Sequence, residues 1–457
     1  MHTAFKLVLQ EGGCYRCALR FLGERTASAY ACPTNGNLSR YLTETSSPCV
    51  VCLGLLSTSQ YLQKCVESIQ QSNYEFKDYK LHVSIPAALY LRQEWLKGMC
   101  SVQGISVPLV TDIKEVFKWV FSPDLAEKLQ RPFNSDSRFH ISLNFCSKES
   151  EQEVKNLSSE IPNLMVKPPR NKKNLPPQIS SSALNKWLGS TAAEKLVALV
   201  PRFNYYSLDL EVECSHLPIY VGGNYMKYSR VVSQSPWTVE GEVMPETSVQ
   251  DCIGNVLKEA YKAQDSILHA AGREDVDVRM LGTGRPFIIE LVQPKLETPK
   301  PIEPLKGDVE VQNLREVGQE AFAELRHGEI EKMKVYSCVV WVSKAISQED
   351  IALLNSTKDL ELAQKTPLRV LHRRPLKTRT KWIHKIHCKQ LNKHFIEVRV
   401  ISSGGTYIKE FVHGDLGRTL PSIGSLLGCK ADIIQLDVLG LGSDIKELVH
   451  ILSQETL

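Results

Sequence analysis

The sequence predicts an α+β protein with a mostly antiparallel mixed sheet. Helical and strand-like stretches follow one another along its 457 residues without the strict alternation that parallel α/β folds show. Two proline-rich breaks, at residues 167–178 and 294–304, predict an exposed connector and a surface loop. At about 100–200 residues per domain, the length predicts two to four domains.

The spacing of apolar residues places the expected elements along the chain. Apolar runs and alternating patterns predict strands, in chain order, at residues 79–85, 139–145, 206–213, 218–221, 277–280, 287–292, 335–342, 395–401 and 433–438. Apolar residues at helical spacing predict helices at residues 113–120, 124–129, 184–199, 248–271 and 309–332.

Composition narrows the class of protein. Apolar residues make up 42% and charged residues 23% of the chain, as in ordinary soluble globular proteins. Most of the 13 cysteines stand singly, which suits a reduced intracellular chain better than a disulfide scaffold. Neither the N-terminal segment nor the uncharged stretch 45–63 is apolar enough for a signal peptide or a membrane span. We therefore expect a nuclear and cytoplasmic protein without a membrane segment; the sequence leaves a mitochondrial location open.

Positive charge is concentrated in one stretch. Residues 362–396 hold ten Lys and Arg and no Asp or Glu, so a chain with a net charge of +4 carries −6 elsewhere. Such a patch predicts contact with phosphates, although a solvated strand pair or a nuclear import signal would look similar. The stretch has only two large aromatic residues, Trp382 and Phe395. This favours contact with the backbone of structured RNA or DNA over stacking on single strands.

Four N-terminal cysteines form two CxxC pairs. Cys14 and Cys17 are separated from Cys49 and Cys52 by 31 residues. Each CxxC turn can direct two thiolates at one metal, so the quartet predicts one structural zinc ion per chain, closed to water. The loop between the pairs is longer than in common zinc ribbons, and two coincidental pairs in a cysteine-rich chain are the alternative.

The second pair also matches half of the zinc deaminase signature. Pro48 precedes Cys49 as in P-C-x-x-C. The H-x-E half must lie upstream and supply the general acid and base. The single upstream histidine, His2, is followed by Thr3 and Ala4, so this chemistry is excluded.

The segment 272–282 is a candidate active segment. On an extended strand its polar and apolar side chains would alternate, with Asp275, Asp277 and Arg279 on one face. A carboxylate beside arginines is suited to staying ionised. A solvated polar strand face explains the same pattern, so the residues alone leave both interpretations open.

With its neighbours, this segment resembles the pseudouridine synthase 10 family of archaea and eukaryotes. The matching segments are GREDVDVRMLGTGRPFIIELVQP at 272–294, KVYSCVVW at 334–341, TPLRVLHRRPLKTR at 366–379 and GTYIKEFVHGDLGRT at 405–419, with a similar loop at 224–237. The resemblance implies a pseudouridine synthase fold over residues 222–457. It also implies a zinc-binding segment at 1–52 and a THUMP-containing α/β accessory domain, which binds RNA, at 53–221.

The resemblance assigns roles to matching residues. It makes Asp275 the catalytic aspartate and Lys409 its cationic partner, where many related synthases have arginine. It implies that Tyr336 stacks on the target base, that Tyr407 contacts substrate and that Leu426 forms an apolar wall under the base. Core packing is the alternative for both tyrosines.

RNA contacts are expected from basic residues in two regions. The predicted contacts are Lys227, Arg230, Arg369, Arg373 and Arg374. The first two lie on a loop that could pinch a tRNA T-arm, and the others belong to the basic stretch. The family commonly has arginine where this chain has Asn224, which puts one phosphate contact in doubt.

The resemblance implies isomerisation of uridine 54 and/or 55 in the tRNA T-loop to pseudouridine. Asp275 would either attack C1′ or abstract a sugar proton, and no organic cofactor is needed because atoms are only rearranged. We expect a monomer that binds tRNA. A non-catalytic RNA-binding adaptor, acting on primary microRNA with its processing machinery, is the alternative. A THUMP-linked methyltransferase is a third alternative. It is disfavoured because the chain lacks a glycine-rich nucleotide loop after a strand.

Overall fold

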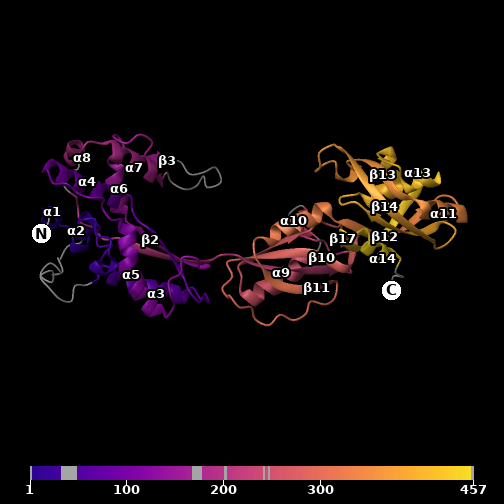
Figure 1. Ribbon diagram of the computed structural model, residues 1–457, viewed down its shortest axis with the longest axis horizontal. Helices are drawn as coiled ribbons and strands as arrows, with labels where there is room; N and C mark the ends of the chain where they lie inside the picture. The colour runs from indigo at the N-terminus through magenta and orange to yellow at the C-terminus, as the bar shows by residue number, and fades with distance from the viewer. Residues whose placement is uncertain are drawn as a thin grey trace. The chain divides into compact units, whose positions relative to one another are not determined.

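The computed structural model describes residues 3–31, 49–166, 178–199, 203–239, 242–244 and 247–453. The chain forms two compact units, Met1–Leu217 and Pro218–Leu457 (Figure 1). The domain boundaries expected after residues 52 and 221 stay predictions. Within the described residues, no helix is long and apolar enough to cross a membrane.

The first unit combines helices with a three-stranded sheet. Its main elements are α1 (Thr3–Gln10), α2 (Tyr15–Phe21), α3 (Ser59–Gln71), β1 (Lys80–Ser84), α4 (Ala88–Val102), α5 (Ile113–Leu129), β2 (Phe139–Cys146), α6 (Lys148–Lys155), β3 (Met165–Val166), β4 (Gln178–Ile179), α7 (Ser181–Ser190), α8 (Ala193–Leu199) and β5 (Asp209–His216). Strand β2 pairs parallel with β1 and antiparallel with β5. Alternate residues of β2, such as Ile141 and Leu143, are buried in the core. The two CxxC segments share this core, and a THUMP identity for the unit stays a prediction.

The second unit is built on a ten-stranded mixed sheet. Its strands are β6 (Ile219–Lys227), β9 (Asp265–Ala270), β10 (Arg279–Val292), β11 (Val309–Val317), β12 (Met333–Val342), β13 (Lys358–Lys365), β14 (Thr378–Gln390), β15 (Phe395–Ser402), β16 (Thr419–Leu420) and β17 (Ala431–Gly442). Their order is β11-β6-β10-β17-β12-β15-β14-β13-β16, with β9 also paired to β10. Among the described strands of this sheet, only β10 and β17 pair in parallel. The predicted α+β class with a mostly antiparallel mixed sheet is therefore confirmed.

Short helices flank this sheet. They are α9 (Val249–Tyr261), α10 (Ala321–Glu331), α11 (Gln348–Ser356), α12 (Ile408–His413), α13 (Ile423–Leu427) and α14 (Ile445–Ser453), and the hairpin β7 (Trp237–Val239) with β8 (Glu242–Met244) completes the unit. In α12, Ile408, Glu410, Phe411 and Val412 are buried, whereas the Lys409 side chain is 19% exposed.

Several expected elements differ from those observed. The predicted helix 248–271 ends at Tyr261, because Lys262 adopts a left-handed conformation, and residues 265–270 form β9 instead. The first part of the predicted helix 309–332 is β11, which pairs with β6. The predicted helix 184–199 is broken into α7 and α8.

The candidate segment 272–282 is also not one extended strand. Strand β10 begins at Arg279, and the amide of Val278 donates to the carbonyl of Asp275 at 3.1 Å, which closes a turn. The shared face predicted for Asp275, Asp277 and Arg279 is therefore wrong. The two aspartates instead lie on a turn at the end of the parallel β10–β17 pair.

Candidate active site

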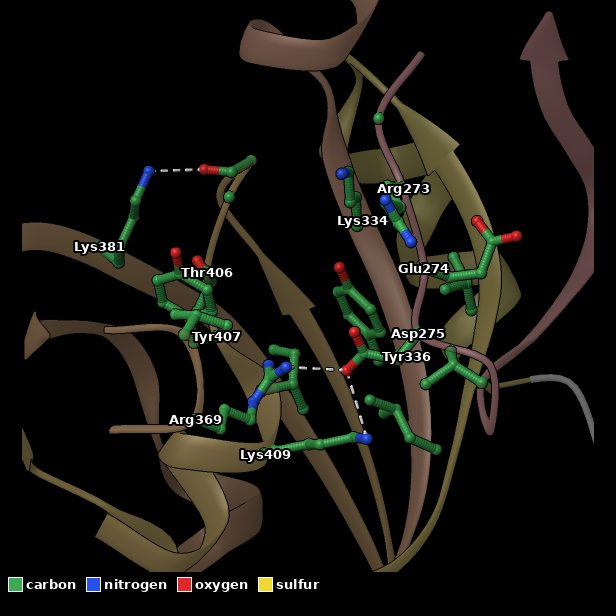
Figure 2. Close-up of a pocket in the computed structure, with 18 of the residues that line it drawn as sticks. Arg273, Glu274, Asp275, Lys334, Tyr336, Arg369, Lys381, Thr406, Tyr407 and Lys409 are labelled. Atoms are coloured by element: carbon green, nitrogen blue, oxygen red, sulfur yellow. Dashed lines mark hydrogen bonds and ion pairs between the residues drawn. The ribbon is translucent and has the colours of Figure 1, made fainter. Parts of the chain in front are cut away.

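A cavity of about 430 Å³ opens in the second unit, beside the turn that carries Asp275 (Figure 2). Its lining comes from the segment 272–278, from β12 and β17, from the loop between β13 and β14, and from residues 404–409. Asp275, Tyr336, Arg369, Arg373, Arg374, Tyr407 and Lys409 line it, as do the apolar residues Val278, Val370, Ile408, Leu436 and Val438. Segments far apart in the sequence thus meet at one hollow.

A buried network of charged and polar groups lies directly beside the turn that carries Asp275. Glu274 and Arg285 have side chains only 1% exposed, and Arg285 Nε donates to Glu274 Oε2 at 2.8 Å. The Tyr225 hydroxyl donates to the same carboxylate at 2.9 and 3.0 Å, and Arg285 Nη1 donates to the carbonyl of Ala271 at 2.8 Å. Glu274 is buried in the wall of the cavity, and the next side chain, Asp275, points into the cavity (Figure 2).

Replacing Arg285 by methionine is expected to destabilise the protein by about 3–5 kcal/mol, because the Glu274 carboxylate would stay buried without its cation. The measurement is urea unfolding of the whole chain. A double variant, Arg285→Met with Glu274→Met, should recover part of the loss, since no unpaired charge is then buried. Equal unfolding free energies for the single variant and the unmodified chain would contradict the structural role of the pair.

Lys227 differs from its predicted role as an RNA contact. Its side chain is fully buried, and Nζ donates to the carbonyls of Val232, Asp275 and Val276 at 2.8, 3.2 and 2.8 Å. Burial lowers the pKa of Lys227 to about 8, despite the opposing effect of Glu274 and other nearby acids. The ammonium is therefore unavailable to RNA, and instead fixes the main chain that carries Asp275.

Arg230, also predicted to bind RNA, is held by the protein. Its Nη2 donates to Asp437 Oδ1 at 2.7 Å, and Nη1 donates to the carbonyls of Asp277 and Leu436 at 2.8 and 3.0 Å. Arg279 approaches the same Asp437 carboxylate at 2.9 and 2.6 Å. Both arginines thus clamp the point where β10 and β17 run parallel.

The Asp275 carboxylate meets two cations on one oxygen. Arg369 Nη1 lies 3.0 Å and Lys409 Nζ 3.3 Å from Asp275 Oδ2 (Figure 2). Within the described residues, the other oxygen, Oδ1, has no hydrogen-bond or ion-pair partner. The side chain is 37% exposed. One oxygen is therefore anchored, and the second is free to act on a molecule in the cavity.

Lys409 bridges both aspartates of the turn. The expected pairing with Asp275 is present, and Nζ also donates to the two oxygens of Asp277 at 2.9 and 2.8 Å. Partial burial raises the pKa of Asp277, but the hydrogen bonds and charge of Lys409 outweigh it and lower the pKa overall. Asp277 is not among the residues that line the cavity, which agrees with a structural role.

Arg369, predicted as a phosphate contact, lies inside the cavity instead. Its Nε donates to Glu410 Oε1 at 2.8 Å while Nη1 reaches Asp275. The Glu410 side chain is 1% exposed, and its Oε2 has no hydrogen-bond partner among the described residues. The sequence argument missed Glu410, although its position directly after Lys409 in α12 could have indicated it. Glu410 fixes the guanidinium that faces Asp275.

Tyr336 and Tyr407 both line the cavity. Burial raises the pKa of Tyr336 to about 12, so its hydroxyl stays protonated at neutral pH. The backbone of Tyr407 is held on both sides by the Gln364 amide, at 3.0 Å each. Leu426 lies on α13 and packs against the core, not in the cavity lining. The apolar surface beside Asp275 comes instead from other residues, among them Val278 and Val438.

Basic side chains extend the site outward. Arg373 and Arg374 are exposed and line the cavity. Lys381 Nζ donates to the carbonyl of Gly404 at 2.7 Å, which supports the loop ahead of Tyr407. Of the five predicted RNA contacts, Arg373 and Arg374 alone are both exposed and free of ion pairs within the described residues.

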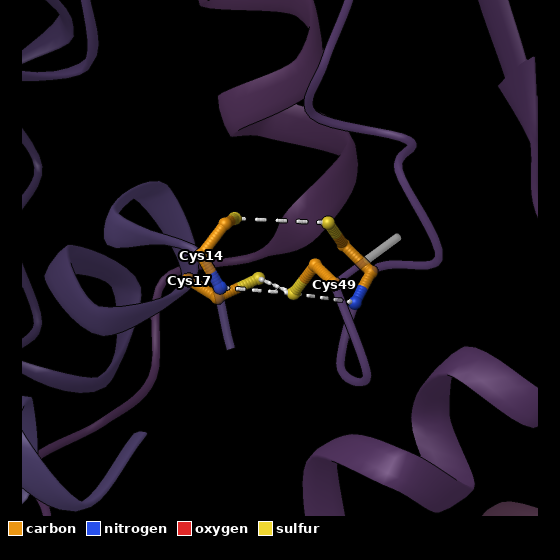
Figure 3. A group of neighbouring side chains, drawn as sticks. Cys14, Cys17 and Cys49 are labelled. Atoms are coloured by element: carbon orange, nitrogen blue, oxygen red, sulfur yellow. Dashed lines mark hydrogen bonds between the residues drawn. The ribbon is translucent and has the colours of Figure 1, made fainter. Parts of the chain in front are cut away.

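The four N-terminal cysteines come together in the first unit. Their sulfur atoms all lie within 4.8 Å of one another (Figure 3), and two pairs, Cys14–Cys52 and Cys17–Cys49, are 3.8 Å apart. A tetrahedral zinc site with bonds of about 2.3 Å places its sulfurs about 3.8 Å apart. The amides of Cys14 and Cys52 point at Cys49 Sγ at 3.1 and 3.4 Å. The cluster could therefore hold a metal ion.

Comparisons with known proteins identify the family of this chain. A family model described as "Pus10, C-terminal" matches residues 220–442, and one described as "Eukaryotic Pus10, N-terminal" matches residues 49–200. The human protein named tRNA pseudouridine synthase Pus10 is 37% identical over 412 residues, covering 85% of this chain and 77% of its own. The Xenopus laevis protein of the same name is 33% identical over 495 residues, covering 95% of each.

Archaeal and structural relatives complete the comparison. The Methanothermobacter marburgensis protein of that name is 40% identical over 245 residues, covering 49% of this chain and 60% of its own. A crystal structure of a Cbf5-Nop10-Gar1 complex aligns with 17% identity and a TM-score of 0.29, over 48% of this chain and 50% of that one. Two relatives above 30% identity span most of both sequences. The chain therefore belongs to the Pus10 family of pseudouridine synthases.

Proposed function

We propose that this protein converts a uridine of the tRNA T-loop to pseudouridine, as a tRNA pseudouridine(55) synthase, with Asp275 as its catalytic carboxylate. The observation that carries the proposal is the Asp275 side chain in the cavity, with Oδ2 anchored by Arg369 and Lys409 and with no partner for Oδ1 in the described part of the chain. Relatives named tRNA pseudouridine synthase Pus10 support tRNA as the substrate. No observation favours the adaptor alternative.

The reaction breaks the N1–C1′ bond, turns the uracil and joins C5 to C1′, after which the C5 proton leaves. Asp275 Oδ1 would either attack C1′ or take a sugar proton, while Arg369 and Lys409 hold Oδ2 in place. Tyr336 presents an aromatic face for the uracil, and Val278 and Val438 help to exclude water, which would otherwise hydrolyse an activated sugar.

Changing Arg369 to lysine is expected to lower the single-turnover rate roughly tenfold while RNA affinity changes little. Arginine uses two separate nitrogens, Nε to Glu410 and Nη1 to Asp275, and a single ammonium cannot keep both contacts. The measurement is pseudouridine formation with enzyme in excess over T-arm RNA. An unchanged rate in Arg369→Lys would contradict a role of Arg369 in the reaction. Lys430→Ala, which changes an exposed residue elsewhere in the same unit, serves as the control.

T-arm RNAs with a single uridine, at position 54 or at position 55, test the proposed function. After incubation with the protein, carbodiimide treatment and primer extension report pseudouridine at each position. We expect a stop at 55, and the RNA with uridine 54 shows whether that position is also used. No stop in either RNA would refute the proposed activity.

We also propose that Cys14, Cys17, Cys49 and Cys52 bind one zinc ion. The spacing of their sulfurs fits a four-thiolate site, and such a closed site stabilises the fold without taking part in the reaction. A monomeric state, a nuclear and cytoplasmic location and binding of primary microRNA stay predictions.

A further inference from the structure

The turn Gly414–Gly417, directly after α12, has an uncommon backbone. Its four residues all have positive φ angles: 79° at Gly414, 45° at Asp415, 56° at Leu416 and 82° at Gly417. Residues with a Cβ atom are strained in this left-handed region, whereas glycine is not. Strain of this kind persists only where surrounding contacts enforce it, and it is concentrated at functional sites.

Neighbouring segments hold the turn in place. The buried Asp415 side chain accepts a hydrogen bond from the amide of Leu368 at 3.2 Å, and lies 3.5 Å from Arg418 Nε. Arg418 Nη2 donates to the carbonyl of Thr366 at 2.7 Å, and its carbonyl accepts from the amide of Lys365 at 3.0 Å. The turn is thus attached to the loop that carries Arg369, Arg373 and Arg374, which line the cavity.

This enforced backbone presents Leu416 to solvent. The side chain is 91% exposed, more than any other large apolar side chain in the described part of the chain. The free protein therefore carries both backbone strain and an exposed leucine, and gains no packing from either. Leu368, whose amide holds the turn, is itself 45% exposed.

The charges around Leu416 identify the class of partner. Arg373 and Arg374 are exposed on the attached loop, and residues 362–396 contain no acidic residue. The nearest acids in sequence, Glu410 and Asp415, are buried and paired with arginines. A partner must combine anionic groups with flat apolar surfaces, as the phosphates and bases of RNA do.

We propose that Leu416 is an apolar wedge that enters the RNA stack as the target uridine leaves it. The inference rests on the proposed function, because a uridine in a folded loop must be flipped out before C1′ can reach Asp275. Flipping leaves a gap between neighbouring bases. Apolar side chains inserted between bases stabilise such distorted stacks, and a rigid turn delivers Leu416 without further ordering of the protein.

Substitutions that suit the backbone test this role. Leu416→Gly removes the side chain and relieves the strain, and Leu416→Asn keeps a side chain of similar size that tolerates positive φ but is polar. Neither should lower the thermal midpoint, so a loss of function cannot be attributed to unfolding. Leu416→Met keeps the apolar character, and Leu353→Ala, at an exposed leucine of α11, is the control.

Flipping is measured without chemistry, in an Asp275→Asn background, from the fluorescence of 2-aminopurine placed beside the target uridine in T-arm RNA. We expect RNA binding to raise the fluorescence when residue 416 is the natural leucine and in Leu416→Met. The rise should be largely lost in Leu416→Gly and Leu416→Asn. With Asp275 intact, Leu416→Gly and Leu416→Asn should reduce the single-turnover rate roughly tenfold. Their RNA affinity should stay within about twofold of that of the unmodified protein.

Two results would overturn the wedge. One is a fluorescence rise in Leu416→Gly or Leu416→Asn that equals the rise in the protein that keeps Leu416. The other is a loss in Leu416→Met as large as that in Leu416→Gly, which would point to a role other than apolar contact. A protein that flips the base but makes no pseudouridine would refute the proposed function and leave the wedge supported, so the two failures are distinguishable.

Discussion

Asp275→Asn is expected to reduce the rate of pseudouridine formation by about 10²–10⁴-fold, because the amide has neither a nucleophilic anion nor a basic oxygen. The side chain keeps its size, and the Glu274–Arg285 pair that positions the turn is unchanged. Binding of T-arm RNA should survive, since removing a carboxylate leaves Arg369 and Lys409 with less negative charge to neutralise. Carbodiimide-mapped primer extension, with filter binding of the same RNA, measures both effects.

Asp277→Asn is the matched control. This carboxylate shares Lys409 but lies outside the cavity lining, so its loss should cost no more than about tenfold, through a less constrained Lys409. Equal stops from Asp275→Asn and the unmodified protein would remove Asp275 as the catalytic group. A greater loss from Asp277→Asn than from Asp275→Asn would reverse the roles of the two aspartates.

The second large effect is expected from Cys49→Ser. Cys49 Sγ accepts from two amides and lies 3.8 Å from Cys17 Sγ, so the change removes a central ligand of the proposed site. Because zinc binding contributes its free energy to folding, we expect the metal to be lost and the first unit to be destabilised by several kcal/mol. Elemental analysis and thermal unfolding measure these changes.

Cys146→Ser, at a partly exposed cysteine outside the cluster, should leave about one zinc per chain. An unmodified protein that contains no metal after gentle purification would contradict the zinc proposal. So would a Cys49→Ser variant that retains a full equivalent of zinc.

The local pattern of apolar residues predicted much of the fold, and it also explains where the predictions were wrong. Alternation predicted β12 and β15, where every second side chain enters one core. It failed at 265–270 and 309–317, where apolar residues fit helical spacing equally well. There, pairing of β9 with β10 and of β11 with β6 decides the structure, and long-range pairing cannot be inferred from a short window of sequence.

In the site, too, some residues were predicted from the sequence and others depend on long-range contacts. The segment around Asp275 and the paired Lys409 were predicted by resemblance. The placement of Arg369 against Asp275 joins residues 94 positions apart, and burial of Lys227 depends on three carbonyls that the fold brings together. Lys227 was expected on an exposed loop but is the last residue of β6, and nothing in the local pattern indicates its burial. The exposed Leu416 likewise requires the backbone of its turn to be known.

The central claim is that this cavity rearranges uridine through Asp275. Release of tritium from T-arm RNA labelled at C5 of uridine tests it most directly, because that hydrogen leaves only when C5 becomes bonded to C1′. We predict one tritium released per pseudouridine formed by the unmodified protein and no release above background by Asp275→Asn. Release by Asp275→Asn at the rate of the unmodified protein, or none by either, would contradict the account.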